Sequence, residues 1–275
     1  VKDYSKNKSD LTTYYNVGKL LKEAGKHYGE GIIKEYSKWL TNELGKGYSI
    51  SNLKNMRNFY VFFSKSQTMS GQLTWSHYIE LLKLVDKEKI NYYIKIIEEE
   101  NLSVRELRQR IKNNDYERLD EETKKKLKDK EKLKLPDLVK NPIQIKNTSG
   151  NNEISEKVLQ KLILEDIPSF LKELGSGFSF IDNEYKINMG DRYNYIDLLL
   201  YNIKYKCYVV VELKVTGLNS NHTGQIQKYM NYIDKNIKNI DDNKTVGIII
   251  CKKENKYVIE YCSDDRIIAR EYELV

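Results

Sequence analysis

Apolar residues in the first 112 positions recur three or four apart, with mostly polar residues between them, which is the period of an amphipathic helix. Ser103 and Glu106 have the spacing of a capping box at the start of the last such stretch. The stretches expected to be helical cover residues 11–21, 32–44, 51–63, 75–84, 88–100 and 104–111. We therefore expect an all-α N-terminal domain over residues 1–115, with a helix-turn-helix-like arrangement.

The period changes to two in the last part of the chain. After a helix over residues 154–174, interrupted at Pro168, short stretches rich in Ile, Val and Tyr alternate between apolar and polar positions. The expected strands cover residues 177–181, 184–189, 193–201, 206–214, 246–251 and 257–261. One further amphipathic helix, at about residues 223–237, separates the fourth strand from the fifth. This order predicts an α/β domain with a mixed central sheet over residues 153–275.

The segment between these two parts, residues 116–152, has neither period. Lys, Glu and Asp dominate residues 117–135, and two prolines and a polar run at residues 147–152 then break any helix. We expect a charged hinge followed by a linker, with the domain boundary inside this segment.

Composition narrows the class of protein without deciding its function. The net charge of +7 is compatible with a polyanionic partner, but solvated surface lysines produce the same balance. The three cysteines lie in or beside apolar runs without a C-x-x-C pair, and the three histidines are too scattered for a zinc site. No apolar stretch is long enough to span a membrane, and the first residues lack the apolar region of a signal peptide. We expect a cytoplasmic protein with reduced thiols and no membrane partner.

Three charged residues are candidates for a catalytic site. Residues 205–214 have the pattern of a buried central strand that ends in Glu212 and Lys214, which share one face of the sheet. A hairpin turning near residues 203–206 sets Asp197 of the preceding strand opposite Glu212. Two converging carboxylates suit Mg²⁺ or Mn²⁺, and an adjacent lysine can orient water for phosphodiester hydrolysis. The alternative is a buried ion-pair network without catalysis.

An acid on one strand followed by Glu-x-Lys on the next resembles the PD-(D/E)XK nuclease superfamily, with Ile196 where the name has proline. Gln225 and Tyr229, on the following helix, resemble the Gln-x-x-x-Tyr element that many of these nucleases place beside the site, and their spacing puts both on one helix face. Glu165, on the helix before the sheet, matches the position of an extra acid in many members. The resemblance implies a restriction-endonuclease-like fold and adds these three residues to the catalytic set.

The whole chain is similar to the YhcG-like family, in which a helical domain precedes such a nuclease. The similarity covers roughly residues 12–118 and 153–274, and includes the stretches 47–57, 73–78, 102–108, 195–198 and 208–214. It implies Mg²⁺-dependent cleavage of DNA. The implied metal ligands are Asp197, Glu212 and the carbonyl oxygen of Leu213.

Two polar helix faces in the N-terminal part are candidates for contact with DNA, expected to be double-stranded. One carries Lys54 and Arg57, and the other carries Arg105 and Arg108. Either can contact phosphates as a recognition helix does, although solvated faces have the same pattern. A homodimer is expected on chemical grounds only, because cutting both strands needs two sites.

A metal-dependent deoxyribonuclease in DNA defence, repair or recombination is therefore the main hypothesis. Its alternatives are a catalytically silent scaffold that binds DNA or a partner, a structure-selective junction resolvase, and an enzyme that cleaves RNA.

Overall fold

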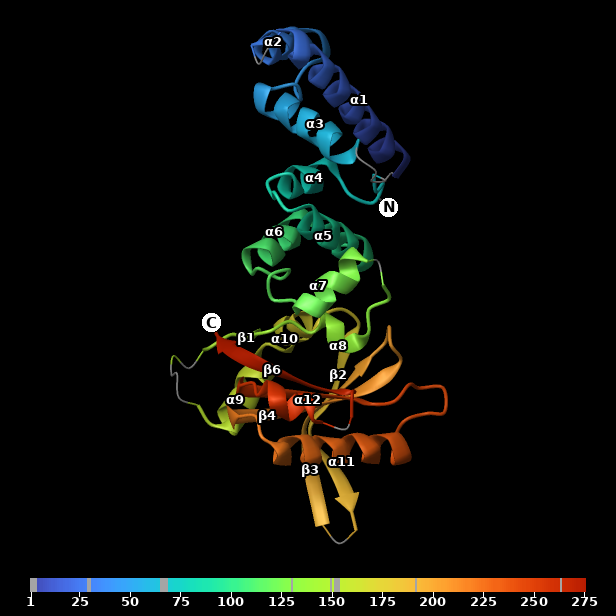
Figure 1. Ribbon diagram of the computed structural model, residues 1–275, viewed down its shortest axis with the longest axis vertical. Helices are drawn as coiled ribbons and strands as arrows, with labels where there is room; N and C mark the ends of the chain where they lie inside the picture. Colours follow the sequence, from blue (N-terminus) through green and yellow to red (C-terminus); the bar gives the residue numbers. More distant parts are fainter. Residues whose placement is uncertain are drawn as a thin grey trace. The chain divides into compact units, whose positions relative to one another are not determined.

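The computed structural model describes residues 4–28, 31–64, 69–129, 131–148, 150, 154–190, 192–262 and 264–275 (Figure 1). The chain divides into two compact units, Val1–Tyr116 and Glu117–Val275.

The N-terminal unit is all-helical, as the periodicity predicts. Its helices are α1(Tyr4–Tyr28), α2(Ile32–Leu44), α3(Ile50–Phe63), α4(Trp75–Leu81), α5(Lys87–Glu100) and α6(Val104–Lys112). The core forms where α3 completely buries Leu53, Met56 and Phe59. The predicted capping box closes at the start of α6, because the backbone N–H of Ser103 donates to Glu106 Oε2 at 2.9 Å and the Glu106 N–H donates to Ser103 Oγ at 3.3 Å. The helix-turn-helix-like arrangement stays a prediction.

Gly18 of α1 lies close against the backbone of α3 at Met56. A Cβ atom at this position would lie 2.0 Å from the backbone oxygen of Met56, so a larger residue needs one helix to move. We predict that Gly18→Ala lowers the free energy of unfolding of this unit by about 1–3 kcal/mol, as overpacking of a core does. Both tryptophans of the chain, Trp39 and Trp75, belong to this unit. Denaturant titration followed by tryptophan fluorescence therefore measures the effect.

Gly31, at the N-cap of α2, supplies the matched control. Its backbone is already in the right-handed helical region, and a Cβ atom there would meet nothing within 4 Å. Gly31→Ala should leave stability unchanged or slightly raised, since alanine restricts the unfolded chain. Equal losses in the two variants would contradict a role for the helix contact.

The C-terminal unit is an α/β domain built on one mixed six-stranded sheet of order β1-β6-β5-β4-β3-β2, which confirms the predicted fold class. Strands β2, β3 and β4 pair antiparallel, whereas β4, β5, β6 and β1 pair parallel. The strands are β1(Ile143–Ile145), β2(Phe178–Met189), β3(Arg192–Asn202), β4(Cys207–Gly217), β5(Val246–Lys253) and β6(Ile267–Leu274), and the helices are α7(Glu121–Lys128), α8(Leu135–Leu138), α9(Glu156–Glu165), α10(Ile167–Leu174), α11(Ser220–Asn236) and α12(Lys256–Glu260).

Helices cover both faces of this sheet. On one face, Leu159 of α9 and Phe170 of α10 pack against a core that includes Val209 of β4. On the other face, Ile226 and Met230 of α11 pack against a second core. The central strands are buried on both sides, which is why residues 206–214 and 246–251 read as nearly continuous apolar runs.

The segment expected as a hinge and linker is folded onto the C-terminal unit instead. From residue 117 onward its described part belongs to that unit and contains α7, α8 and β1, which pairs with β6. The apolar residues that anchor it are completely or almost completely buried: Leu135, Val139, Ile143 and Ile145. They are too few and too irregularly spaced to show a period, so charge dominates the local pattern.

Two further predictions about the sheet were wrong in detail. Residues 257–261, expected as a strand, lie mainly in the short helix α12, and the last strand is β6, which was missed. The two strands expected at residues 177–189 are one strand, β2, with an irregular register between Phe180 and Asp182. None of the helices in the described part of the chain is both long and apolar enough to cross a lipid bilayer.

Candidate active site

Asp197 and Glu212 come together where β3 and β4 separate. The ladder between these strands ends at the pair Leu198 and Val211. Beyond that pair the Asp197 carboxylate accepts a hydrogen bond from the backbone N–H of Leu213 at 2.8 Å. The side chain of Gln160, on α9, donates to the backbone oxygen of Asp197 at 3.0 Å. The two predicted acids are thus held on adjacent strands at the point where the sheet opens.

Glu212 is a buried carboxylate that is only weakly partnered. Its residue is 1% exposed, and its two carboxylate oxygens have no hydrogen bond of good geometry to the described residues. The Nζ of Lys214 lies 3.2 Å from Oε2 as an ion pair. Burial, together with the charge of Asp197, raises the pKa of Glu212 to about 8, although Lys214 opposes this. The charged form of this carboxylate is therefore costly even beside Lys214, and a bound metal cation would offset the cost.

Lys214 lies among three carboxylates. Besides Glu212, its Nζ is 3.8 Å from Oε2 of Glu156, at the start of α9. Burial lowers the pKa of Lys214, but the charges of Glu212, Glu156 and Asp197 outweigh it, and the pKa is raised. Burial also raises the pKa of Asp197, and Glu156 and Glu184 add to the effect. The site therefore holds an excess of negative charge.

Tyr229 of α11 lies within electrostatic reach of the same carboxylates, and Gln225 is hydrogen-bonded to Tyr229. The amide nitrogen of Gln225 donates to the Tyr229 hydroxyl at 3.1 Å. Burial raises the pKa of Tyr229, and the charges of Glu212 and Asp197 contribute to the rise. The structure thus brings five of the six predicted catalytic residues together, from β3, β4 and α11.

Two protein-family models match this chain. The YhcG PDDEXK nuclease domain matches residues 136–275, and the DUF1016 N-terminal domain matches residues 4–118. The chain belongs to the YhcG nuclease-domain family.

Relatives include a protein of Escherichia coli (strain K12) named "Putative nuclease YhcG", which is 26% identical over an alignment that covers 95% of this chain and 82% of the relative. Among solved structures, a repair endonuclease from Pyrococcus abyssi is 19% identical, with a TM-score of 0.32 over 46% of this chain and 49% of its own. The EndoMS–dsDNA2 complex is 18% identical, with a TM-score of 0.32 over 47% of this chain and 48% of its own. The matched region spans about half the length of those two structures.

Glu165, the sixth predicted catalytic residue of this nuclease domain, lies elsewhere. It closes α9, and the Thr148 hydroxyl donates to its Oε2 at 2.7 Å. Glu156 opens the same helix, about 13 Å away at the rise of an α-helix. The acids that the structure adds near the site are therefore Glu156 and Glu184. Neither stands out in sequence, since an acid in the first turn of a helix is common and Glu184 shows its unusual φ of 48° only in the structure.

The predicted DNA-contacting residues lie on helices of the N-terminal unit. Lys54 is exposed and Arg57 is half-buried on α3, and Arg105 is exposed on α6. Arg108 pairs with Glu80 at 2.7 Å while its side chain remains 61% exposed. Their contact with DNA stays a prediction.

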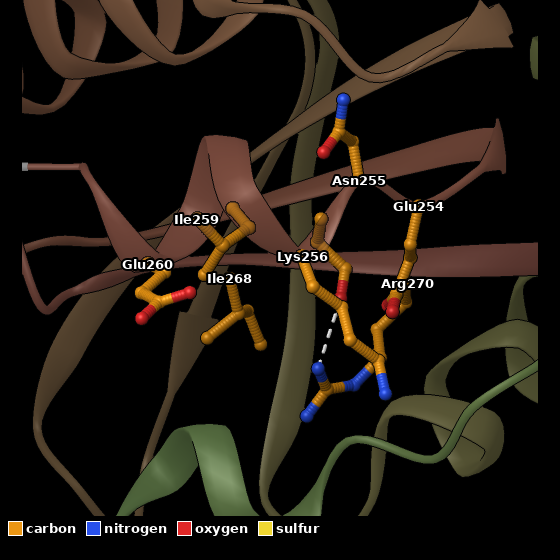
Figure 2. A pocket seen from close by; sticks show the side chains of 8 residues that line it. Glu254, Asn255, Lys256, Ile259, Glu260, Ile268 and Arg270 are labelled. Atoms are coloured by element: carbon orange, nitrogen blue, oxygen red, sulfur yellow. Dashed lines mark hydrogen bonds between the residues drawn. The ribbon is translucent and has the colours of Figure 1, made fainter.

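A pocket of about 270 Å³ lies between α12 and β6 (Figure 2). None of the predicted catalytic residues lines it. Its most buried cation, Arg270, already donates to the backbone oxygen of Val139 at 2.9 Å and to Asp120 at 2.8 Å. The pocket is thus distinct from the candidate site, and its arginine has a structural role.

Gly247 of β5 allows α11 to lie close against the sheet. A Cβ atom there would lie 2.6 Å from Met230 Sδ and 2.9 Å from Ile226 Cδ1. We predict that Gly247→Ala destabilises the C-terminal unit by about 1–3 kcal/mol. It should also lower nuclease activity, because α11 carries Gln225 and Tyr229. Thermal denaturation and a cleavage assay on the same preparation measure both effects, and unchanged activity at reduced stability would show that the position of α11 is not critical.

Proposed function

We propose that this chain is a metal-dependent nuclease that hydrolyses phosphodiester bonds of DNA. The observation that carries the proposal is the buried Glu212 carboxylate, whose pKa is raised by burial and by the neighbouring Asp197 in spite of its ion pair with Lys214. Hard divalent cations prefer such oxygen ligands. Membership of a PDDEXK nuclease family supports the same reaction class.

Asp197, Glu212 and the Leu213 carbonyl would hold Mg²⁺ or Mn²⁺. The described residues contain no cluster of three His, Cys, Asp or Glu side chains able to bind a metal, so a backbone oxygen and water must complete the set. The bound cation would supply positive charge for the phosphate and a more acidic water. The N–H of Leu213 fixes the orientation of Asp197.

Lys214 is the residue we assign to the attacking water. Its raised pKa keeps the ammonium charged, so it donates hydrogen bonds to the water and stabilises the charge that develops on the phosphate. In-line attack with a leaving 3′ oxygen would give a 5′-phosphate end. Gln225 and Tyr229 would contact the substrate from α11. The helical unit, with Lys54, Arg57, Arg105 and Arg108, would recognise double-stranded DNA or a partner.

Cleavage of plasmid DNA in Mg²⁺, Mn²⁺ or EDTA tests the proposal. We expect cutting by the wild type in either metal, none in EDTA, and loss of cutting in Asp197→Asn. DNA binding measured in parallel identifies a silent scaffold, which would bind without cutting in any metal. Branched junctions, flaps, linear duplexes and RNA, offered as separate substrates, distinguish a general deoxyribonuclease from a resolvase or a ribonuclease.

A further inference from the structure

We propose that one face of the β2–β3 arm is a stacking platform for unpaired bases of the DNA substrate. The arm is the two-stranded end of this hairpin, residues 185–189 and 192–196, beyond the last pair between β3 and β4. Figure 1 shows this end of the hairpin extending past α11. The inference rests on the proposed function and adds a substrate class to it.

Two tyrosines dominate the exposed face of the arm. Tyr193 is 61% exposed and Tyr195 is 52% exposed. Their cross-strand partners, Asn188 and Lys186, are also exposed. The Nζ of Lys186 lies 3.6 Å from the centre of the Tyr193 ring, in a cation–π contact. The face thus combines two rings with one cation and one amide.

The opposite face of the arm is anchored. Ile187 and Ile196 are completely buried in the same core as Tyr229 and Ile226 of α11. Since side chains of a strand alternate between faces, this burial turns the tyrosines outward. The rings are therefore presented on a fixed support rather than on a loose hairpin.

The position of the platform makes it continuous with the candidate site. Tyr195 precedes Asp197 by two residues, a separation of about 7 Å along a strand. Glu184, opposite the Asp197 region on β2, adds a negative charge at the end nearest the site. A chain of nucleotides that places a phosphate at Asp197 and Glu212 would bring neighbouring bases over the rings.

The chemistry of the face favours bases over phosphates. A surface that follows a phosphate backbone carries several Lys and Arg side chains, whereas this face has one lysine, already over a ring. Aromatic rings stack on bases of any sequence, but only where the bases are not covered by their neighbours in a duplex. Flaps, gaps and single-stranded ends meet this condition.

Binding of fluorescein-labelled oligonucleotides to the full chain in EDTA, followed by anisotropy, tests the platform without cleavage. The probes are a single strand, a blunt duplex of the same sequence, a single strand in which abasic sites replace the bases, and an RNA strand. The variants are Tyr193→Ala with Tyr195→Ala, and Tyr193→Phe with Tyr195→Phe. Tyr257→Ala removes an exposed tyrosine of α12, 73% exposed, and is the matched control.

We expect the double alanine variant to bind the single strand at least about tenfold more weakly, with affinity for the duplex and the abasic strand unchanged within about twofold. The phenylalanine variant and Tyr257→Ala should bind as the wild type does, and thermal denaturation should show all variants folded. Unchanged affinity for the single strand, an equal loss on the abasic strand or duplex, or a loss confined to RNA would overturn the proposal. Cleavage in Mg²⁺ is measured in a separate assay. A wild-type protein that binds the single strand but never cuts it would overturn the proposed nuclease activity, but not the stacking platform.

Discussion

Glu212→Gln is expected to lower the rate of DNA cleavage by about three orders of magnitude while making the metal-free protein more resistant to heat. The loss of activity follows from removing one of the two carboxylates that would hold the cation and the charge it supplies. The gain in stability follows from burial. Glu212 is 1% exposed, and burial with the charge of Asp197 raises its pKa to about 8 in spite of the ion pair with Lys214, so its charge opposes folding.

Glu254→Gln is the matched control for this result. Oε1 of Glu254 is also buried without a partner in the described chain, and burial likewise raises the pKa of its carboxyl group. It lies in the pocket beside α12 and not among the predicted catalytic residues. Glu254→Gln should therefore change stability in the same direction and leave cleavage intact.

Thermal denaturation in EDTA and in Mg²⁺ separates the two contributions. Mg²⁺ should raise the melting temperature of the wild type and of Glu254→Gln, but not that of Glu212→Gln, because binding to the native state alone stabilises it. A Glu212→Gln protein that cuts DNA at the rate of the wild type would remove Glu212 from the mechanism. An equal Mg²⁺ shift in all three proteins would place the cation elsewhere.

The elements that the sequence predicts well are those whose periodicity comes from burial on a defined face. Leu53, Met56 and Phe59 of α3 recur at helical spacing because one face of that helix is buried. β6 was missed because Arg270 and the acids after it conceal its apolar start. The guanidinium of Arg270 is buried and bonded to Asp120, 150 positions away, and such a contact leaves no local signal.

The residues of the candidate site also differ in how well the sequence predicts them. Asp197, Glu212 and Lys214 lie on two strands joined by a short hairpin, so counting residues was enough to bring them together. The position of Glu156 near the site depends on how α9 packs on the sheet, and no local sequence pattern indicates that packing. The resemblance to other nucleases predicted an extra acid at Glu165, which lies at the opposite end of α9 from Glu156.

Glu173→Gln is expected to destabilise the C-terminal unit by about 3–5 kcal/mol, as the loss of one partner in a buried ion pair does. The Glu173 carboxylate, in α10, accepts hydrogen bonds from Arg118 and from the backbone N–H of Gln144, and Lys140 lies 3.5 Å away. Arg118 is 8% exposed and Lys140 is 2% exposed. The neutral amide removes the negative charge from beside both buried cations, Arg118 and Lys140.

The pH dependence of stability tests whether the Glu173 carboxylate acts through Arg118 and Lys140. Burial raises the pKa of Glu173, but the Arg118 hydrogen bond and the charge of Lys140 outweigh it, and the pKa is lowered. The carboxylate therefore stabilises the fold above its unfolded pKa, and this contribution disappears as the pH falls through the lowered folded pKa. The difference in stability between wild type and Glu173→Gln should be full at pH 7 and should shrink below about pH 4.5.

Urea denaturation followed by far-ultraviolet circular dichroism measures the effect, while tryptophan fluorescence, which reports on the N-terminal unit, should not change. Glu260→Gln, on the exposed side of α12, controls for the loss of a surface charge. The double variant Arg118→Met with Glu173→Gln should cost less than the sum of the two single changes, because each removes part of the same interaction. Strict additivity, or a loss that persists unchanged into acid, would show that the carboxylate does not act through these cations.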